Sequence, residues 1–371
     1  MNKFGKVSTV ALLLAAVVVL AGLWKLRADS PAKWTFTKES EPLLTDSKLR
    51  DEIFDALAAA EKAGTDPGIS HFNVRVATAF EKDGKERVVV GGNSEYEIPE
   101  GIHGETSVLN HVIALYGPET TRRNVRFLAF FAKQCGASSC GDCRDYQLAT
   151  TDYEHLLFVC GQASDRTVKV TRFADQLVCE RNFPEVQGAK VPLAPEELRQ
   201  LVQSAEEARR GGVTLFTKGR HTGAAALSFS GKTYRSAGAD DAAFHYRYPI
   251  GGVLQQAMTE RDYFLRAIVV SGENGEWPVV NYRDRQYGYE ASSFNHAAGK
   301  APIVLILSNG RGQFRMTTFE TALPNAFSTA DFMPEALKIF LASHGWSARA
   351  VFYAGQHPDV ALRDSLLRKL R

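Results

Sequence analysis

Two stretches of the chain place hydrophobic residues at helical spacing, and the two share the same start and end. Each follows a Pro-Leu pair, at 42–43 and at 192–193, and each closes at glycine. A period near 3.6 residues that ends at glycine is typical of an amphipathic helix. The sequence therefore predicts helices over 48–64 and 197–212, and we expect each to open a separate structural unit.

The segments that follow these two helices match one another in the same order. Glycine and lysine positions, a Val-Leu step and a Phe-Leu strand recur at similar spacing. Such collinear self-similarity indicates an internal duplication. The matched pairs are 84–95 with 231–241, 101–112 with 246–257, and 125–147 with 262–286.

Each unit is predicted to run helix, strand, strand, helix, strand, helix and a further strand. The last strands, 155–161 and 301–308, are rich in apolar residues, which indicates burial. The pattern predicts an α/β fold, a three-layer α/β/α sandwich duplicated in tandem. The expected organisation is an N-terminal segment (1–30), a first unit (40–185), a linker with the opening helix (186–212), a second unit (213–330) and a C-terminal extension (331–371).

The start of the chain carries an uncharged apolar run over residues 8–24, behind Lys3 and Lys6. As a helix it would span roughly 25 Å, slightly less than a hydrocarbon core of ~30 Å. We interpret residues 1–30 as a single-span membrane anchor, with a cleaved signal segment and export as the alternative. Positive charges flank both ends of the run, so the side of the membrane that carries the body stays open.

The composition narrows the function classes. With 44% hydrophobic and 23% charged residues, the 371-residue chain is an ordinary globular protein, which excludes intrinsic disorder and a multi-span membrane protein. Lysine and arginine number 44 against 42 acids, a net charge of +2, and no basic run forms a phosphate-binding stripe. Nucleic acid is therefore not favoured as a partner.

All five cysteines lie between residues 135 and 179. The odd count in so long a chain argues against a disulfide scaffold. A metal or a reactive site is the better interpretation.

A metal site is predicted from His103, Cys140 and Cys143. One imidazole and two thiolates suit zinc, and three protein ligands leave a fourth position free for water, as in catalytic zinc sites. Arg144 and a helix N-terminus would favour the thiolate form of the cysteines. Glu105 lies two residues from His103, and its carboxylate can take a proton from a water whose pKa zinc lowers from ~15.7 towards ~7.

The His-x-Glu and Cys-x-x-Cys pattern is the known signature of the zinc deaminases. Residues 45–330 resemble the cytidine deaminase superfamily, and within it the two-repeat, dimeric enzymes. The resemblance implies that His103, Cys140 and Cys143 hold Zn²⁺, and that Glu105 carries the proton from the attacking water to the departing amine. The motifs that carry it are ISHFNVRVATA (69–79), GGNSE (91–95), HGE (103–105) and CGDCR (140–144).

The same resemblance implies the substrate-binding residues. Asn93 and Glu95 match the pair that holds the ribose hydroxyls, and Phe72 matches the aromatic residue that packs on the pyrimidine. Gly104 stands where the family has alanine and keeps a backbone N–H towards the base. Ser139 replaces the proline that precedes the first cysteine in the family.

The second unit lacks these groups. In the sequence alignment Tyr248 stands at the position of His103 and Ile250 at that of Glu105, while Val279 and Tyr282 replace the two cysteines. We expect a degenerate, non-catalytic unit. The resemblance implies that it packs on the first unit and helps to close active sites across a homodimer.

The predicted activity is that of a hydrolase acting on a cyclic amidine. It would convert a cytidine-like nucleoside to its uridine-like product and release ammonia, as in pyrimidine salvage. A deaminase acting on a base in RNA or DNA is the second hypothesis. A metal-binding protein or scaffold without turnover is the third.

The spacing Cys135-x4-Cys140-x2-Cys143 also fits a [2Fe–2S] site, with Cys160 or Cys179 as the fourth ligand. This alternative leaves His103 and Glu105 without a role. Under the zinc hypothesis, Cys135, Cys160 and Cys179 are expected to be small buried hydrophobic residues.

Overall fold

The computed structural model describes residues 34–328 except 65–66, 69–72, 96–100, 133–134, 136–137, 179–192, 215–220 and 241–245. The predicted N-terminal anchor (1–30) and the C-terminal extension (331–371) lie outside the described residues. Among the helices that are described, none has the length and apolar character needed to cross a membrane.

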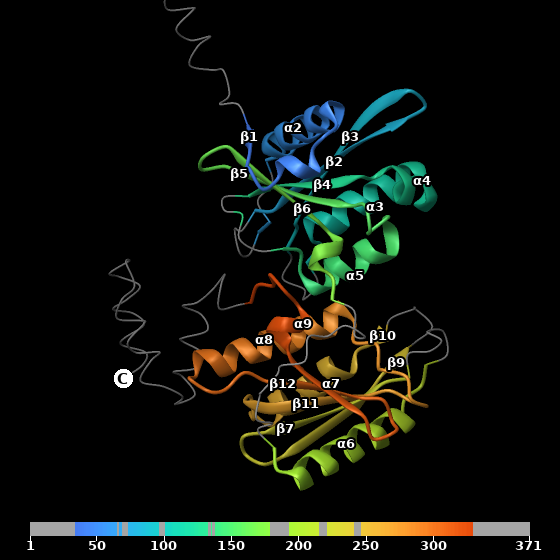
Figure 1. Ribbon diagram of the computed structural model, residues 1–371, viewed down its shortest axis with the longest axis vertical. Helices are drawn as coiled ribbons and strands as arrows, with labels where there is room; N and C mark the ends of the chain where they lie inside the picture. Colours follow the sequence, from blue (N-terminus) through green and yellow to red (C-terminus); the bar gives the residue numbers. More distant parts are fainter. Residues whose placement is uncertain are drawn as a thin grey trace, which may run out of the picture.

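The first unit is a six-stranded mixed sheet with helices on both faces (Figure 1). Its strands lie in the order β1-β6-β5-β4-β2-β3. The elements along the chain are β1 (Thr35–Phe36), α2 (Ser47–Lys62), β2 (Arg75–Lys82), β3 (Lys85–Gly92), α3 (Gly104–Tyr116), α4 (Pro118–Asn124), β4 (Phe127–Ala132), α5 (Gly141–Thr150), β5 (Leu157–Gln162) and β6 (Thr167–Arg172).

The central strand β4 explains the layered arrangement. Successive side chains of a strand point to opposite faces, so a strand covered on both faces is apolar at every position. Phe127 and Ala129 pack with the apolar face of α2, whereas Leu128 and Phe130 pack with α3 on the other side. The predicted α/β/α layering of this unit is confirmed.

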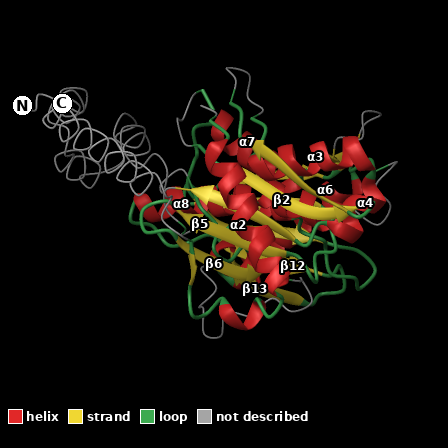
Figure 2. Cartoon of the chain, turned by 90° about the horizontal axis from the view of Figure 1, so that it is seen from above, coloured by secondary structure: helices red, strands yellow, loops and turns green. Residues whose placement is uncertain are grey.

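The second unit contains a five-stranded sheet in the order β13-β12-β11-β7-β8 and a separate β9-β10 pair. Figure 2 labels β12 and β13 of the larger sheet. Helix α6 covers one face of the larger sheet, and α7 and α8 cover the other. The elements are α6 (Pro195–Arg210), β7 (Gly223–Ser228), β8 (Thr233–Ala237), β9 (Ala239–Asp240), β10 (Tyr246–Arg247), α7 (Pro249–Thr259), β11 (Leu265–Ser271), α8 (Tyr282–Ala297), β12 (Val304–Ser308), β13 (Phe314–Thr318) and α9 (Phe319–Ala322).

The two main sheets have the same strand order and directions. Apart from β1, each has one parallel pair, β4 with β5 and β11 with β12, and all other neighbours are antiparallel. After its last predicted strand, each unit has one more antiparallel strand, β6 or β13, that the sequence pattern did not predict. Strand β13 lies at the edge of its sheet, whereas β6 is flanked by β1.

The two units meet where the N-termini of α5 and α8 face each other (Figure 1). The Asp145 carboxylate accepts hydrogen bonds from the backbone N–H groups of Tyr282, over 3.1 Å, and of Arg283, over 3.0 Å. An acidic side chain of the first unit therefore caps a helix of the second. A Cβ atom at Gly141 would lie 2.0 Å from the Tyr282 carbonyl oxygen, so this approach requires glycine.

The helix starts correct the sequence alignment of the two units. Cys140 and Asn281 are the residues that precede the first turns of α5 and α8. The position equivalent to Cys140 is therefore Asn281, and that of Cys143 is Asp284, rather than the predicted Val279 and Tyr282. The sequence alignment was two residues out of register because it paired Arg144 with Arg283.

Buried arginines support the corrected register. Arg144 and Arg285 occupy the same turn of their helices and are 0% and 1% exposed. The Nε atom of Arg144 donates to the Ser139 carbonyl over 2.9 Å, and that of Arg285 donates to the Val280 carbonyl over 2.8 Å. The alignment of Tyr248 with His103 agrees with the helix starts, because each residue immediately precedes its helix, α7 or α3.

Asp284 occupies the position of Cys143, a candidate metal ligand, and binds the protein backbone. Its carboxylate accepts hydrogen bonds from Gly251 N over 3.0 Å and from Ile250 N over 3.4 Å, both at the start of α7. Burial, with a smaller contribution from the charge of Asp145, raises the pKa of Asp284 from its ordinary 3.8 to about 7. In the second unit, a buried carboxyl group thus connects α8 to α7 at the place where the first unit carries its thiols.

This raised pKa predicts a pH-dependent stability. The folded state holds the Asp284 proton more tightly than the unfolded state, so this stabilisation is complete below pH 3.8 and is lost as the pH rises to about 7. We expect the free energy of unfolding to decline across this window, and Asp284→Asn to remove that part of the decline. Urea denaturation at a series of pH values measures it, and an equally steep decline in the variant would contradict the assignment.

Candidate active site

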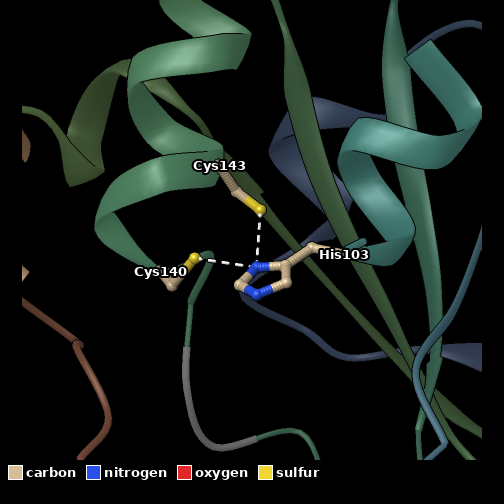
Figure 3. A group of neighbouring side chains, drawn as sticks. All are labelled: His103, Cys140 and Cys143. Carbon is tan, nitrogen blue, oxygen red and sulfur yellow. Dashed lines mark hydrogen bonds between the residues drawn. The ribbon is translucent and has the colours of Figure 1, made fainter. Parts of the chain in front are cut away.

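Three predicted metal ligands converge at the starts of two neighbouring helices (Figure 3). His103 precedes α3, Cys140 precedes α5, and Cys143 lies in the first turn of α5. His103 Nδ1 lies 3.1 Å from Cys140 Sγ and 3.3 Å from Cys143 Sγ. Within the described part of the chain, this is the one group of three or more His, Cys, Asp or Glu side chains with its ligand atoms within 4.8 Å of one another.

The donor set fits zinc. Bond lengths of about 2.05 Å to nitrogen and about 2.3 Å to sulfur, in tetrahedral geometry, place the two donor atoms about 3.6 Å apart. The distances from His103 Nδ1 to Cys140 Sγ and Cys143 Sγ, 3.1 and 3.3 Å, are a few tenths of an ångström shorter, so small side-chain movements would accommodate the ion. Three soft or borderline ligands also leave one coordination position open.

The Cys140 thiol is prepared for deprotonation. Hydrogen bonds from Cys143 and then from His103 hold the pKa of Cys140 well below its usual range, although burial opposes them. The hydrogen bond between His103 and Cys140 raises the pKa of His103 to about 9. The hydrogen bond between Cys143 and Cys140 raises the pKa of Cys143, so Cys143 keeps its proton. These groups share protons that a bound metal ion would displace, because thiolate and neutral imidazole are the ligating forms.

Glu105 lies in the first turn of α3, and its side chain is buried, with 6% exposure. Burial is the main cause that raises its pKa, followed by the nearby charge of Cys140. The side chain of Ser139 acts in the opposite direction on this pKa and lowers it. A buried carboxyl group whose pKa is raised suits general acid and base catalysis.

The residue between His103 and Glu105 is glycine for a steric reason. A Cβ atom at Gly104 would lie 2.8 Å from Val76 Cγ2 and 3.0 Å from the Val74 carbonyl oxygen. The close packing of β2 against the start of α3 therefore explains why this position is glycine and not alanine.

Gly104→Ala is expected to lower the free energy of unfolding by about 1–3 kcal/mol, as for other overpacked sites. Val76→Ala in the same chain would relieve one of the two close contacts and recover part of the loss. Gly64→Ala is the control, because a Cβ at Gly64 meets no atom within 4 Å. Thermal and urea denaturation of the variants measure the effect, and equal stabilities of the two glycine variants would refute the steric explanation.

The predicted ribose-binding residues lie beside the segment that leads into the metal site. Ser94 forms an isolated β-bridge with Ile102, the residue before His103. Asn93 Oδ1 accepts from Val74 N over 2.8 Å, and Asn93 Nδ2 donates to Glu95 Oε1 over 3.4 Å. Asn93 and Glu95 are thus brought together, whereas Phe72 lies outside the described residues.

A disulfide joins Cys135 to Cys160, with their Cα atoms 5.9 Å apart. The expectation that both are free, small hydrophobic residues was wrong. The pairing occurs because Cys160 lies in β5, next to β4, and Cys135 lies just beyond the end of β4. Cys179 lies outside the described residues.

The disulfide also removes the iron–sulfur alternative in its predicted form. Cys135 was its first ligand and Cys160 a candidate fourth, and a sulfur in a disulfide is no thiolate ligand. Cys140 and Cys143 are the free cysteines of the described residues, and both are buried. The sequence carried one signal of this pairing. The candidate metal site uses Cys140 and Cys143, so the other cysteines are available for a disulfide.

No protein-family model matches the chain, and no curated protein matches it either. Solved structures that are similar to it include a cytidine deaminase from Burkholderia pseudomallei, with 23% identity and a TM-score of 0.31. That match covers 35% of this chain and 98% of the other. Cytidine deaminases from Mycobacterium leprae (18% identity, TM-score 0.26) and Mycobacterium tuberculosis (23%, 0.25) each cover 36% of this chain, and 100% and 95% of their own length are matched. All these TM-scores are below 0.5.

Proposed function

We propose that this protein is a zinc-dependent hydrolytic deaminase that acts on a cytidine-like nucleoside. The observation that carries the proposal is the convergence of His103 Nδ1 with the sulfur atoms of Cys140 and Cys143. Glu105, whose carboxyl group is buried, follows His103 by two residues. A three-ligand metal site beside a proton carrier is the arrangement that hydrolytic deamination needs.

When bound, zinc would supply Lewis-acid activation of a water molecule at the open coordination position. Glu105 would take a proton from the water as the water oxygen adds to C4, and would deliver it to N3 of the ring. Glu105 would then carry the remaining hydroxyl proton to the amino group, so that the C4–N bond breaks and ammonia leaves. The balance is one nucleoside and one water converted to one uridine-like product and one ammonia.

The substrate would be held by groups beside the site. We assign the ribose hydroxyls to Asn93 and Glu95, the backbone N–H of Gly104 to the base, and Phe72 to the face of the pyrimidine. The Asn93–Glu95 hydrogen bond and the Ser94–Ile102 bridge support a common role for this loop. A balanced net charge of +2 favours a free nucleoside over a base in RNA or DNA.

We assign the second unit to a degenerate repeat of the first. The shared strand order and directions and the matched arginines Arg144 and Arg285 support this origin. Since Asp284 and Ile250 stand where the first unit has Cys143 and Glu105, this unit would have a structural role. We also propose that the protein is a homodimer in which the second unit helps to close the active sites.

The location of the protein is also a proposal. Disulfides persist in oxidising compartments and are rare in the cytosol. The Cys135–Cys160 disulfide therefore supports a body outside the cytoplasm, either anchored by residues 1–30 or exported after cleavage. Trapping thiols with an alkylating reagent in intact cells tests this, since a reduced Cys135 in the native protein would contradict it.

The first test of function is metal content and ammonia release on the full-length protein. We expect one zinc per chain and stoichiometric ammonia from cytidine or a close analogue. Zinc without turnover of free nucleosides, but with turnover of a cytosine-containing RNA or single-stranded DNA, would favour a polynucleotide substrate. Zinc with no turnover of either class would favour a silent metal-binding protein and overturn the proposed activity.

A further inference from the structure

Residues 138–145, the thiol segment, carry both candidate thiol ligands and contact the second unit near both of their ends. The backbone N–H of Ser138 donates to the Asn325 carbonyl over 2.9 Å. Towards the other end, Arg144 Nη2 donates to the Pro324 carbonyl over 2.6 Å. Both acceptors follow α9 in the second unit. Backbone groups of the second unit therefore bind the thiol segment before and after its two cysteines.

Gln286 of α8 contacts the thiol segment between the two cysteines. Its Oε1 atom accepts from the backbone N–H of Gly141 over 3.2 Å. Its Nε2 atom donates to the Phe327 carbonyl over 2.8 Å, which orients the amide, because only the nitrogen of an amide can donate. The first N–H groups of a helix have no partner inside it. Gln286 therefore supplies the partner that the first residue of α5 needs.

An ion pair joins the two units one residue further along. The Arg283 guanidinium pairs with the carboxylate of Asp142, which lies between the two cysteines in the chain. The two side chains are 43% and 38% exposed, so the pair by itself contributes little to stability. The Asp145 carboxylate accepts from the backbone N–H of Arg283 over 3.0 Å and so fixes the residue that carries the charge. The ion pair thus adds direction to contacts that are already in place.

The contacts between α5 and α8 are reciprocal. Asp145 is the fifth residue of α5, and Gln286 is the fifth residue of α8. Each accepts from the first N–H of the opposite helix, Asp145 from Tyr282 and Gln286 from Gly141. Displacing one helix start therefore removes a hydrogen-bond partner from the other, so α8 restrains the position of the thiol segment.

The third candidate ligand is held by other contacts. His103 precedes α3, whose buried residues pack on the sheet of the first unit. The distances from His103 Nδ1 to Cys140 Sγ and Cys143 Sγ, 3.1 and 3.3 Å, join this helix start to the thiol segment. They depend on where α8 holds the thiol segment, as well as on the packing inside the first unit.

We propose that Gln286 is a positioning residue for the metal site, and that Arg283 assists it. Both belong to the unit without the metal-binding motif. They hold the two thiols at the separation from the imidazole that zinc requires, by fixing the backbone between the cysteines. The second unit thus serves the metal site of its own chain, beyond its proposed part in a homodimer. The inference rests on the proposed function and deepens it.

The zinc affinity of the full-length protein tests the role of Gln286. Gln286→Met keeps the length of the side chain and removes the acceptor, so we expect zinc binding to weaken by about 3- to 10-fold, the loss of one hydrogen bond. Gln286→Glu keeps an acceptor for the Gly141 N–H and should not weaken zinc binding. Competition with a chromogenic chelator measures the affinity without any substrate. Equal losses in the two variants would assign the effect to the Phe327 contact and overturn the proposal.

Gln256→Met is the matched control. The side-chain amide of Gln256 also donates to a backbone carbonyl, that of Arg235 over 2.8 Å, but both residues lie within the second unit. This variant should leave the zinc affinity unchanged. An equal loss in Gln256→Met and Gln286→Met would mean that zinc binding follows the general stability of the second unit, and it would overturn the positioning role.

A charge exchange tests the contribution of Arg283. Arg283→Asp places two carboxylates opposite each other and should weaken zinc binding by about 10-fold, the lower end of the effect of residues around metal ligands. Adding Asp142→Arg restores opposite charges. Both residues are the second of their helix, so the exchange keeps the sum of their interactions with the helix dipoles. Zinc affinity should recover in the double variant, and no recovery would overturn the part assigned to Arg283.

These measurements separate the positioning role from the proposed function. If the wild type binds one zinc, an unchanged affinity in Gln286→Met overturns the positioning role, whether or not ammonia is released. Absence of ammonia release by the zinc-loaded wild type overturns the deaminase function alone. A wild type that binds no zinc would overturn both.

Discussion

Glu105→Gln is expected to lower kcat for ammonia release by about 10²- to 10⁴-fold while one zinc stays bound per chain. The amide has nearly the shape of the carboxyl group but can neither take a proton from water nor pass one to the amine. His103, Cys140 and Cys143 are untouched, so metal binding should survive. Ammonia release under saturating substrate, together with zinc content by mass spectrometry, measures both quantities.

Glu52→Gln is the matched control for this prediction. Glu52 is also a buried glutamate of the first unit, with 2% exposure, but it lies on α2 and pairs with Arg126. It should affect stability and leave kcat within about twofold of the wild type, a difference of under 0.5 kcal/mol. A comparable loss of kcat in both variants would mean that the effect comes from burying an amide, not from proton transfer at Glu105.

Removal of the disulfide should have the largest effect on stability. Cys135 and Cys160 are separated by 25 residues in sequence, and closing a loop of this length in the unfolded chain corresponds to about 3.5 kcal/mol in the chain-entropy model. The variant Cys135→Ala/Cys160→Ala is therefore expected to lose roughly that free energy of unfolding. Urea denaturation of the variant and of the oxidised wild type gives the difference.

A reductant provides the internal control. Reduced wild-type protein should fall towards the stability of the double variant, whereas the variant itself should not respond to the reductant. Since the disulfide joins strand β5 to the loop that leads to Cys140, zinc content should be followed in the same samples. A stability loss below about 1 kcal/mol in the variant would contradict the proposed role of the crosslink.

Much of the fold could be predicted because its signals are local. Helical spacing with a closing glycine located α2 and α6, and the apolar strands indicated a sheet covered on both faces. Strands β6 and β13 were missed, because both are only partly buried and therefore have a weaker hydrophobic pattern than the central strands. The register between the two units was misjudged because a shared Arg-Asp pair outweighed the helix starts.

The sequence by itself determined the metal ligands as candidates, because each short motif lies within one helix start. His103 and Glu105 are two residues apart at the start of α3, and Cys140 and Cys143 are three residues apart at the start of α5. Their convergence, with His103 Nδ1 3.1 Å from Cys140 Sγ, agrees with that expectation.

Only the tertiary structure decided the contacts between distant segments. It paired Cys135 with Cys160 and seated Asp284 on the N-terminus of α7. It also brought the amide of Gln286 to the backbone N–H of Gly141. Each of these depends on how strands and helices far apart in sequence pack together, and a disulfide or a buried hydrogen bond has no periodic pattern along the chain. Local order was therefore readable from neighbouring residues, whereas the partners of buried polar groups depended on the folded packing.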